Sequence, residues 1–128
     1  MYLFPGEEVM YKDTPEWIKI EKSDFEYAPG CHALIAICNG TCDRGLRPLA
    51  CRLFPLTPYF EVNKLRIIMD SRANSVCPLA RTAKIGELNP EFVRRVEYVS
   101  RVLTYNSDIY SFIRSLSGLV DELHRFTD

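Results

Sequence analysis

The sequence predicts a small α+β domain, in which two short β-hairpins and a cysteine-rich loop segment pack on a C-terminal helical pair. Three observations favour this fold class. Apolar and polar residues alternate in the first half, prolines and glycines interrupt the middle, and a helical period begins near residue 89. A chain of 128 residues suffices for one domain with its own core. We divide it into segments 1–30, 31–80 and 89–127.

The composition is that of an ordinary globular domain. Hydrophobic residues make up 47% of the chain and charged residues 26%, and the net charge is −1. These values exclude a disordered chain and a polybasic nucleic-acid binder. No apolar run reaches the ~18 residues of a membrane span, and the first five residues lack the features of a signal peptide. We expect a cytoplasmic protein without nucleic-acid or membrane partners, whereas a protein partner stays open.

Segment 1–30 begins with a turn at Pro5-Gly6, after which come Glu7 and Glu8. Acidic side chains stabilise the positive N-terminal end of a helix, so we predict a short helix from Glu7 to about Lys12.

A first hairpin is predicted after this helix. Trp17-Ile18-Lys19-Ile20 and Phe25-Glu26-Tyr27 alternate apolar and polar residues on either side of Glu21-Lys22-Ser23-Asp24. This pattern predicts two strands that turn at residues 21–24, and Pro29-Gly30 would end the second strand.

Segment 31–80 holds all five cysteines and four of the eight prolines, so we expect it to be rich in loops. Within it, Tyr59-Phe60-Glu61-Val62 and Leu65-Arg66-Ile67-Ile68-Met69 predict a second hairpin. The connection is Asn63-Lys64, and asparagine tolerates the left-handed backbone conformation that a tight turn needs.

The helical period in segment 89–127 predicts two helices. Asn89 is a candidate N-cap with Pro90 at the first helical position, and one apolar face carries Phe92, Val96, Val99 and Leu103. On the exposed face, oppositely charged residues four apart support the helix, at Glu91 with Arg95 and Glu97 with Arg101.

This first helix is expected to end near Tyr105. Asn106-Ser107-Asp108 can finish it and cap a second helix, whose apolar face is Ile109, Phe112, Ile113, Leu116, Val120 and Leu123. Short connections favour two helices packed antiparallel, and a single kinked helix is the alternative.

The cysteines are the main candidate functional residues of the sequence. They are Cys31, Cys38, Cys42, Cys51 and Cys77, spaced C(x6)C(x3)C(x8)C(x25)C, and His32 adjoins the first. An odd number in a reducing compartment argues against a full disulfide framework. Thiolates and imidazole are preferred ligands of zinc and iron. Gly40 would let the backbone turn between Cys38 and Cys42, so that both sulfur atoms could bind the same metal. Alternatively the cysteines pack as small apolar residues, as the neighbours of Cys51 suggest.

Residues 31 to about 80 also resemble a known family. Cys38-Asn39-Gly40-Thr41-Cys42, with Arg47-Pro48-Leu49-Ala50-Cys51-Arg52-Leu53-Phe54-Pro55 after it, is similar to the second half of the CxxCxxCC family, the YkgJ-type zinc- or iron-chelating proteins. Cys77-Pro78 resembles a further cysteine of that group, and Leu3-Phe4-Pro5-Gly6-Glu7 resembles the residues after the first cysteine cluster of the family. The resemblance, shared with flagellin lysine methylase, implies a metal or iron–sulfur centre. The first cluster is absent, which implies a shortened member or fewer ligands.

The predicted function is therefore metal binding, of zinc, iron or an iron–sulfur cluster, in a structural or chelating role. The predicted ligands are Cys38, Cys42, Cys51 and Cys77, with Cys31 or His32 as substitutes. We expect at most one metal per chain, because a closed zinc site takes four ligands. Two alternatives remain: a shortened or accessory relative of an iron–sulfur protein methyltransferase, and a metal-free interaction module.

Two arginines flank the motif. Arg47 and Arg52 can hydrogen-bond to metal-bound thiolates and so reduce the negative charge of the centre. They can instead pair with Asp43 or Asp70.

Catalysis is not supported by any motif. The sequence has no glycine-rich phosphate loop, nucleophile elbow or dinucleotide fingerprint.

The basic residues after Cys77 are interleaved with acidic residues, which favours a solvent-exposed face over a nucleic-acid-binding surface. These basic residues are Arg81, Lys84, Arg94, Arg95 and Arg101. Tyr98, Tyr105 and Tyr110 are either edges of the core or an exposed strip for a partner.

Overall fold

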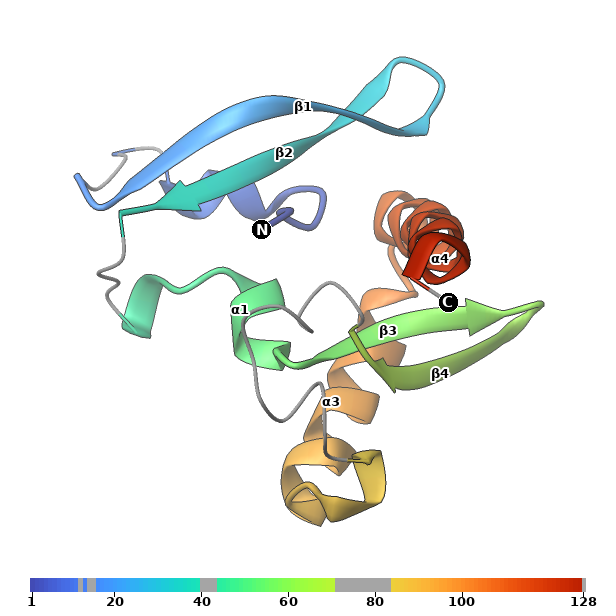
Figure 1. Ribbon diagram of the computed structural model, residues 1–128. Coiled ribbons are helices and arrows are strands. Elements are labelled where there is room, and N and C mark those ends of the chain that lie inside the picture. The colour runs from blue at the N-terminus through green and yellow to red at the C-terminus, as the bar shows by residue number, and fades with distance from the viewer. Residues whose placement is uncertain (12, 14–15, 40–43, 71–83, 128) are drawn as a thin grey trace. The chain divides into compact units, whose positions relative to one another are not determined.

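The computed structural model describes residues 1–11, 13, 16–39, 44–70 and 84–127, and the side chains of all of these except 44 and 123–127 (Figure 1). It confirms the α+β fold class. Its contacts divide the chain into two compact units, Met1–Arg52 and Leu53–Asp128, and each is described by itself. The elements in order are η1 (Glu7–Tyr11), β1 (Ile18–Ala28), β2 (Cys31–Cys38), η2 (Arg44–Leu46), α1 (Leu49–Leu53), β3 (Leu56–Glu61), β4 (Lys64–Met69), η4 (Ile85–Glu87), α3 (Pro90–Leu103) and α4 (Ser107–Thr127).

The first hairpin differs from its prediction. Residues 21–24 do not turn but continue β1, which pairs antiparallel with β2. The register shifts between Lys22 and Glu26, so the polar residues expected to form a turn occupy an irregular stretch of a long strand. The chain turns instead at Pro29-Gly30, where Gly30 has a φ of 77°.

Residues 31–38 are therefore a strand and not a loop. The residues from Ala33 to Ile37 are all apolar, and Ala33 and Ala36 are buried. The prediction of a loop-rich segment was wrong here, since proline and glycine are absent from this stretch.

The core of the first unit lies on one face of this hairpin. Leu3, Tyr11, Ile18 and Ala36 are its buried residues, and Trp17, Ile20, Leu34 and Leu46 pack against them. The N-terminal residues run along β2, because Leu3 N–H donates to Leu34 O and Ala36 N–H donates to Met1 O. The short helix predicted at Glu7 is confirmed as the 3₁₀ helix η1.

The second predicted hairpin is confirmed as β3 and β4. The register pairs Glu61 with Lys64, so the two turn residues are Val62 and Asn63, one position earlier than predicted. Val62 has a φ of 59°, the left-handed conformation that the sequence predicted at Asn63. A β-branched side chain is strained in that conformation.

Both predicted helix starts are also confirmed. The side chain of Asn89 accepts hydrogen bonds from the backbone N–H groups of Glu91 and Phe92, and Pro90 is the first helical residue of α3. Arg95 and Glu91 form the expected pair at 2.9 Å. The side chain of Asn106 caps α4 in the same way, so two separate helices form and not one kinked helix.

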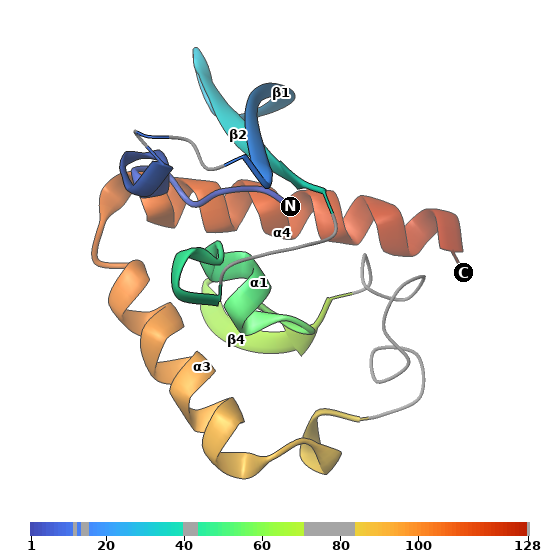
Figure 2. The same ribbon diagram turned by 90° about the vertical axis from the view of Figure 1, so that its left-hand side faces the viewer.

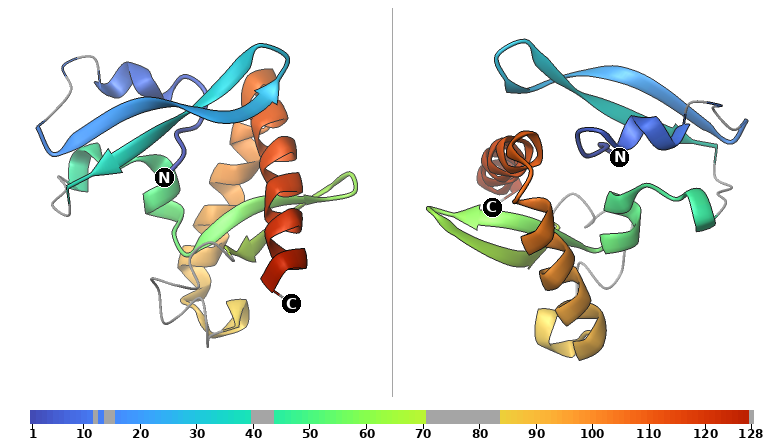
Figure 3. Two further views of the ribbon diagram at one scale, coloured as in Figure 1. Left: turned by 45° about the horizontal axis from the view of Figure 1, so that its top comes forward. Right: turned by 180° about the vertical axis from the view of Figure 1, so that it is seen from behind.

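The prediction that the two helices pack antiparallel against each other was wrong. Within the second unit, α4 packs on β3, and α3 packs on β4 and β3. Figure 2 shows the two helices diverging from their connection, and Figure 3 shows α4 beside the hairpin. The apolar face of α4 is buried at Phe112, Ile113, Leu116 and Val120, and β3 supplies part of the surface beside this helix. Within the described residues, no helix combines the length and apolar character needed to cross a bilayer.

Candidate metal centre

Glu7 connects two segments of the first unit that are far apart in the sequence. One carboxylate oxygen accepts a hydrogen bond of 2.9 Å from the N–H of Phe4, and the other accepts one of 2.5 Å from the N–H of Leu49. Leu49 is the first residue of α1, whose initial N–H groups lack partners within the helix. Glu7 therefore anchors the start of α1 beside η1. Burial raises the pKa of the Glu7 carboxyl, and its backbone hydrogen bonds and Arg52 act in the opposite direction.

Tyr11 anchors the preceding turn. Its ring is buried, and its hydroxyl donates a hydrogen bond of 2.6 Å to the carbonyl oxygen of Leu46. Burial raises the pKa of this hydroxyl; Glu7, Cys51 and Cys38 raise it further, and Arg52 lowers it. Cys38 and Cys51, two of the predicted ligands, are therefore among the groups that raise the pKa of this hydroxyl.

The two cysteines reach this region from different elements. Cys38 is the last residue of β2 and is exposed, whereas Cys51 lies in α1 and is partly buried. Both carry thiols and form no disulfide. The hydrogen bonds of Glu7 and Tyr11 place α1 and the turn before it beside η1. Two of the four ligands that the sequence predicted therefore lie in the same compact unit, on separate elements.

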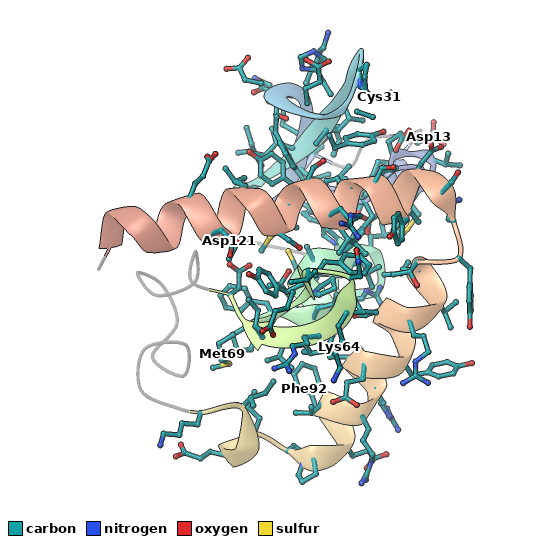
Figure 4. The ribbon with its side chains drawn as sticks, turned by 90° about the vertical axis from the view of Figure 1, so that its right-hand side faces the viewer. Asp13, Cys31, Lys64, Met69, Phe92 and Asp121 are labelled. Atoms are coloured by element: carbon teal, nitrogen blue, oxygen red, sulfur yellow. The ribbon has the colours of Figure 1, made fainter. Side chains whose placement is uncertain are left out.

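Cys31 lies at the opposite end of the same strand. Figure 4 shows it at the turn of the hairpin. Because β2 is an eight-residue strand with a rise of about 3.3 Å per residue, the Cα atoms of Cys31 and Cys38 are about 23 Å apart. Zinc ligands lie within about 2.3 Å of the metal. Cys31 is therefore too far from Cys38 to substitute in the same mononuclear centre.

His32 is excluded from that centre for the same reason. Its Nδ1 atom lies 3.0 Å from the carbonyl oxygen of Ser23, and its Nε2 atom lies 3.9 Å from the Glu26 carboxylate. These contacts orient the imidazole ring within the β1–β2 hairpin. His32 and Cys31 are also neighbours on a strand, so their side chains leave it on opposite faces.

The other two predicted ligands, Cys42 and Cys77, lie outside the described residues. Within the part of the chain that is described, no three Cys, His, Asp or Glu side chains converge in a way that would hold a metal ion. As ligands, Cys38 and Cys51 would supply two of the four that a closed tetrahedral zinc site takes. Their donor chemistry fits zinc or iron, and the number of described ligands falls short of four.

Arg52 organises the turn that precedes α1. Its Nε donates to the carbonyl oxygen of Arg47 at 3.1 Å, and its Nη2 donates to that of Gly45 at 3.0 Å. The guanidinium also acts on the charges of Glu7 and Tyr11, because it lowers the pKa of both groups. It therefore carries its positive charge near Glu7 and the Tyr11 hydroxyl. Of the alternative ion-pair partners, Asp43 lies outside the described residues and Asp70 is buried in the second unit.

The roles of Glu7 and Tyr11 were not predicted from the sequence. The three-residue spacing from Phe4 to Glu7 is that of a capping box, and it is a signal for the first hydrogen bond of Glu7. The bond to Leu49 spans 42 residues and that of Tyr11 to Leu46 spans 35. No local pattern indicates such pairs.

Comparison of the chain with protein-family models, curated proteins and solved structures finds no match. The resemblance to the CxxCxxCC family therefore stays an expectation from the sequence, based on the residues from Cys38 to Pro55, on Cys77-Pro78 and on Leu3 to Glu7.

Proposed function

We propose that this protein binds one zinc or iron ion in the cytoplasm, in a structural or chelating role, through a centre that includes Cys38, Cys42 and Cys51. One observation supports the proposal: Cys38 and Cys51 present thiols from separate elements, β2 and α1, of the same compact unit. Cytoplasmic thiols stay reduced and are therefore available as ligands.

The sequence adds a third thiol to this pair. Cys42 comes four residues after Cys38 and nine before Cys51, within the connection between β2 and η2. Three thiolates and a divalent cation have a net charge of −1. The positive charge of Arg52 would reduce the cost of holding that charge at a partly buried site.

The fourth ligand is predicted from the sequence to be Cys77. A water molecule in the fourth position is the alternative, as in zinc sites that keep one position open. Replacing Cys77 separates the two, because a protein ligand contributes to affinity and a water molecule does not depend on residue 77.

The test is elemental analysis of the full chain, purified without chelators and without air, together with native mass spectrometry. We expect no more than one metal per chain. Cys38→Ser, Cys42→Ser and Cys51→Ser should each lower the metal content strongly. Cys31→Ser is the matched control, because it removes an exposed thiol from the far end of the same strand.

Stability provides a second readout. Structural zinc contributes on the order of 10 kcal/mol to the folding of small domains, whereas a typical substitution costs roughly 1 kcal/mol. A strong chelator should therefore lower the melting temperature of the parent protein and leave Cys51→Ser unchanged. Absence of metal after growth in metal-replete medium would refute the proposal, as would an equal loss of metal in Cys31→Ser. A brown, oxygen-sensitive protein would assign the centre to iron and sulfide and favour the methyltransferase relative.

A further inference from the structure

A groove lies between β4 and α3 in the second unit. It has a volume of about 780 Å³, and its apolar lining includes Leu65, Ile67, Leu88 and Val93. These side chains are only partly buried, so the groove retains apolar surface that water contacts. Partly covered apolar surface of this kind is a common feature of ligand and peptide sites.

The rim of the groove is positively charged. Four basic residues, Lys64, Arg66, Arg94 and Arg101, line it, against the single acidic residue Glu97 among its lining residues. Arg66 pairs with Glu61 at 2.8 Å. The other three form no ion pair with the described residues. In Figure 4, Lys64 lies on the side of β4 that faces α3. A protein whose net charge is −1 thus collects unpaired positive charge at one groove.

Two exposed tyrosines extend this surface along α3. Tyr98 is 66% exposed and Tyr105 is 81% exposed. Arg94, Tyr98 and Arg101 succeed each other at intervals of four and three residues, so they form one ridge on α3, and Tyr105 follows the C-cap of the helix. The sequence left open whether the tyrosines are edges of the core or an exposed strip, and the exposure of Tyr98 and Tyr105 shows that these two are not edges of the core. Tyrosine and arginine are the residue types enriched at the energetic centres of protein interfaces.

We propose that the groove and the adjoining ridge of α3 dock an acidic peptide segment of a partner protein that also carries apolar side chains. The unpaired cations select for carboxylates, and the apolar floor selects for leucine-like or aromatic side chains. Arg94 and Arg101 are seven residues apart on a helix, which corresponds to about 10 Å along its axis. Carboxylates three residues apart on an extended peptide have the same separation. This proposal does not depend on metal binding.

The experiment is selection of a phage-displayed library of random 12-residue peptides on the full-length protein. The affinity of the most enriched peptide is then measured by fluorescence anisotropy. We expect the enriched sequences to combine Asp or Glu with large apolar residues. Arg94→Glu and Arg101→Glu should each weaken binding about fivefold, the upper range for one exposed ion pair. Tyr98→Ala should also weaken it, and added salt should lower the affinity.

The matched control is Lys22→Glu, which makes the same change in net charge on an exposed residue of β1. It should leave the affinity within twofold. Thermal melts of every variant verify folding, and Arg94→Gln and Arg101→Gln provide milder versions of the charge changes.

Several results would overturn the proposal. They are the absence of enriched acidic peptides, an unchanged affinity in the arginine variants, and an equal loss in Lys22→Glu. Binding of a single-stranded RNA that the arginine variants abolish would assign the surface to nucleic acid instead. Self-association of the chain that the same variants abolish would assign it to a second copy.

Discussion

The hydroxyl of Tyr11 donates a hydrogen bond of 2.6 Å to the carbonyl oxygen of Leu46. This bond joins the 3₁₀ helix near the N-terminus to the end of η2, and Leu46 packs against the same core as the tyrosine ring. Cys51 lies five residues beyond Leu46, so the position of this thiol relative to Cys38 depends on the turn that Tyr11 holds. Tyr11 thereby links the stability of the first unit to the geometry of the candidate metal centre.

Tyr11→Phe should lower the free energy of unfolding by about 1 kcal/mol, because it removes one intramolecular hydrogen bond and leaves the ring in place. Chemical denaturation monitored by circular dichroism measures the change. The control is Tyr98→Phe, whose ring is 66% exposed and which should change the stability by less than about 0.5 kcal/mol. Equal denaturation curves for Tyr11→Phe and the parent would show that the bond does not stabilise the fold.

Glu7→Gln should change how stability depends on pH. Burial raises the pKa of the Glu7 carboxyl in the folded state above its ordinary value of 4.5. The folded state therefore favours the protonated form, and the resulting stabilisation is complete below pH 4.5 and is lost as the pH rises through the raised pKa. Glutamine does not titrate, so the parent should lose stability relative to Glu7→Gln over that window.

The measurement is the difference in unfolding free energy between the parent and Glu7→Gln at a series of pH values from acid to neutral. Comparing differences removes the contributions of the other carboxylates. Glu8→Gln is the control substitution at the exposed neighbouring residue. A difference in unfolding free energy between the parent and Glu7→Gln that does not change with pH would contradict the effect assigned to burial.

Val62→Asn should stabilise the protein. Val62 occupies the turn between β3 and β4 with a φ of 59°, and its side chain is 81% exposed, so the substitution loses little packing. Asparagine tolerates this backbone conformation better than a β-branched residue, and we expect a gain of about 1 kcal/mol. Thermal and chemical denaturation measure it. Val9→Asn, at an exposed residue of η1, controls for the loss of a surface valine. A loss of stability in Val62→Asn would contradict the strain assigned to this residue.

Asp121→Asn should lower the pKa of Tyr59. The Tyr59 hydroxyl donates a hydrogen bond of 2.5 Å to the Asp121 carboxylate, and this bond is the main reason that the pKa of Tyr59 lies above its ordinary value of 10.0. Asparagine can still accept the bond but is uncharged, so ionisation of Tyr59 becomes easier. A pH titration of ¹³C-labelled tyrosine by NMR reports the change. Glu122→Gln is the neighbouring control, and an unchanged Tyr59 titration in Asp121→Asn would contradict the assignment.

The elements that the sequence predicted correctly depend on contacts between near neighbours. Asn89 caps N–H groups two and three residues away, and Glu91 pairs with Arg95 four residues away. Such contacts form whenever the local backbone is helical, so residue type and spacing suffice to predict them. The β3–β4 hairpin is similar, because its strands are adjacent in the chain, although the exact turn residue was misplaced by one position.

The sequence by itself therefore determined the α+β class, the helix starts, the second hairpin and the thiol-rich composition of the candidate centre. Only the tertiary structure decided that residues 21–24 stay within β1, that Cys31 and Cys38 end the same strand, and that Glu7 and Tyr11 hold the segment carrying Cys51. The physical reason is that Glu21 and Lys22 pair with β2 and the Ser23 hydroxyl donates a hydrogen bond to Ala33 of β2, which outweighs the local preference of polar residues for a turn. Hydrogen bonds across 35 and 42 residues likewise depend on how the whole unit packs, and no spacing along the chain indicates them.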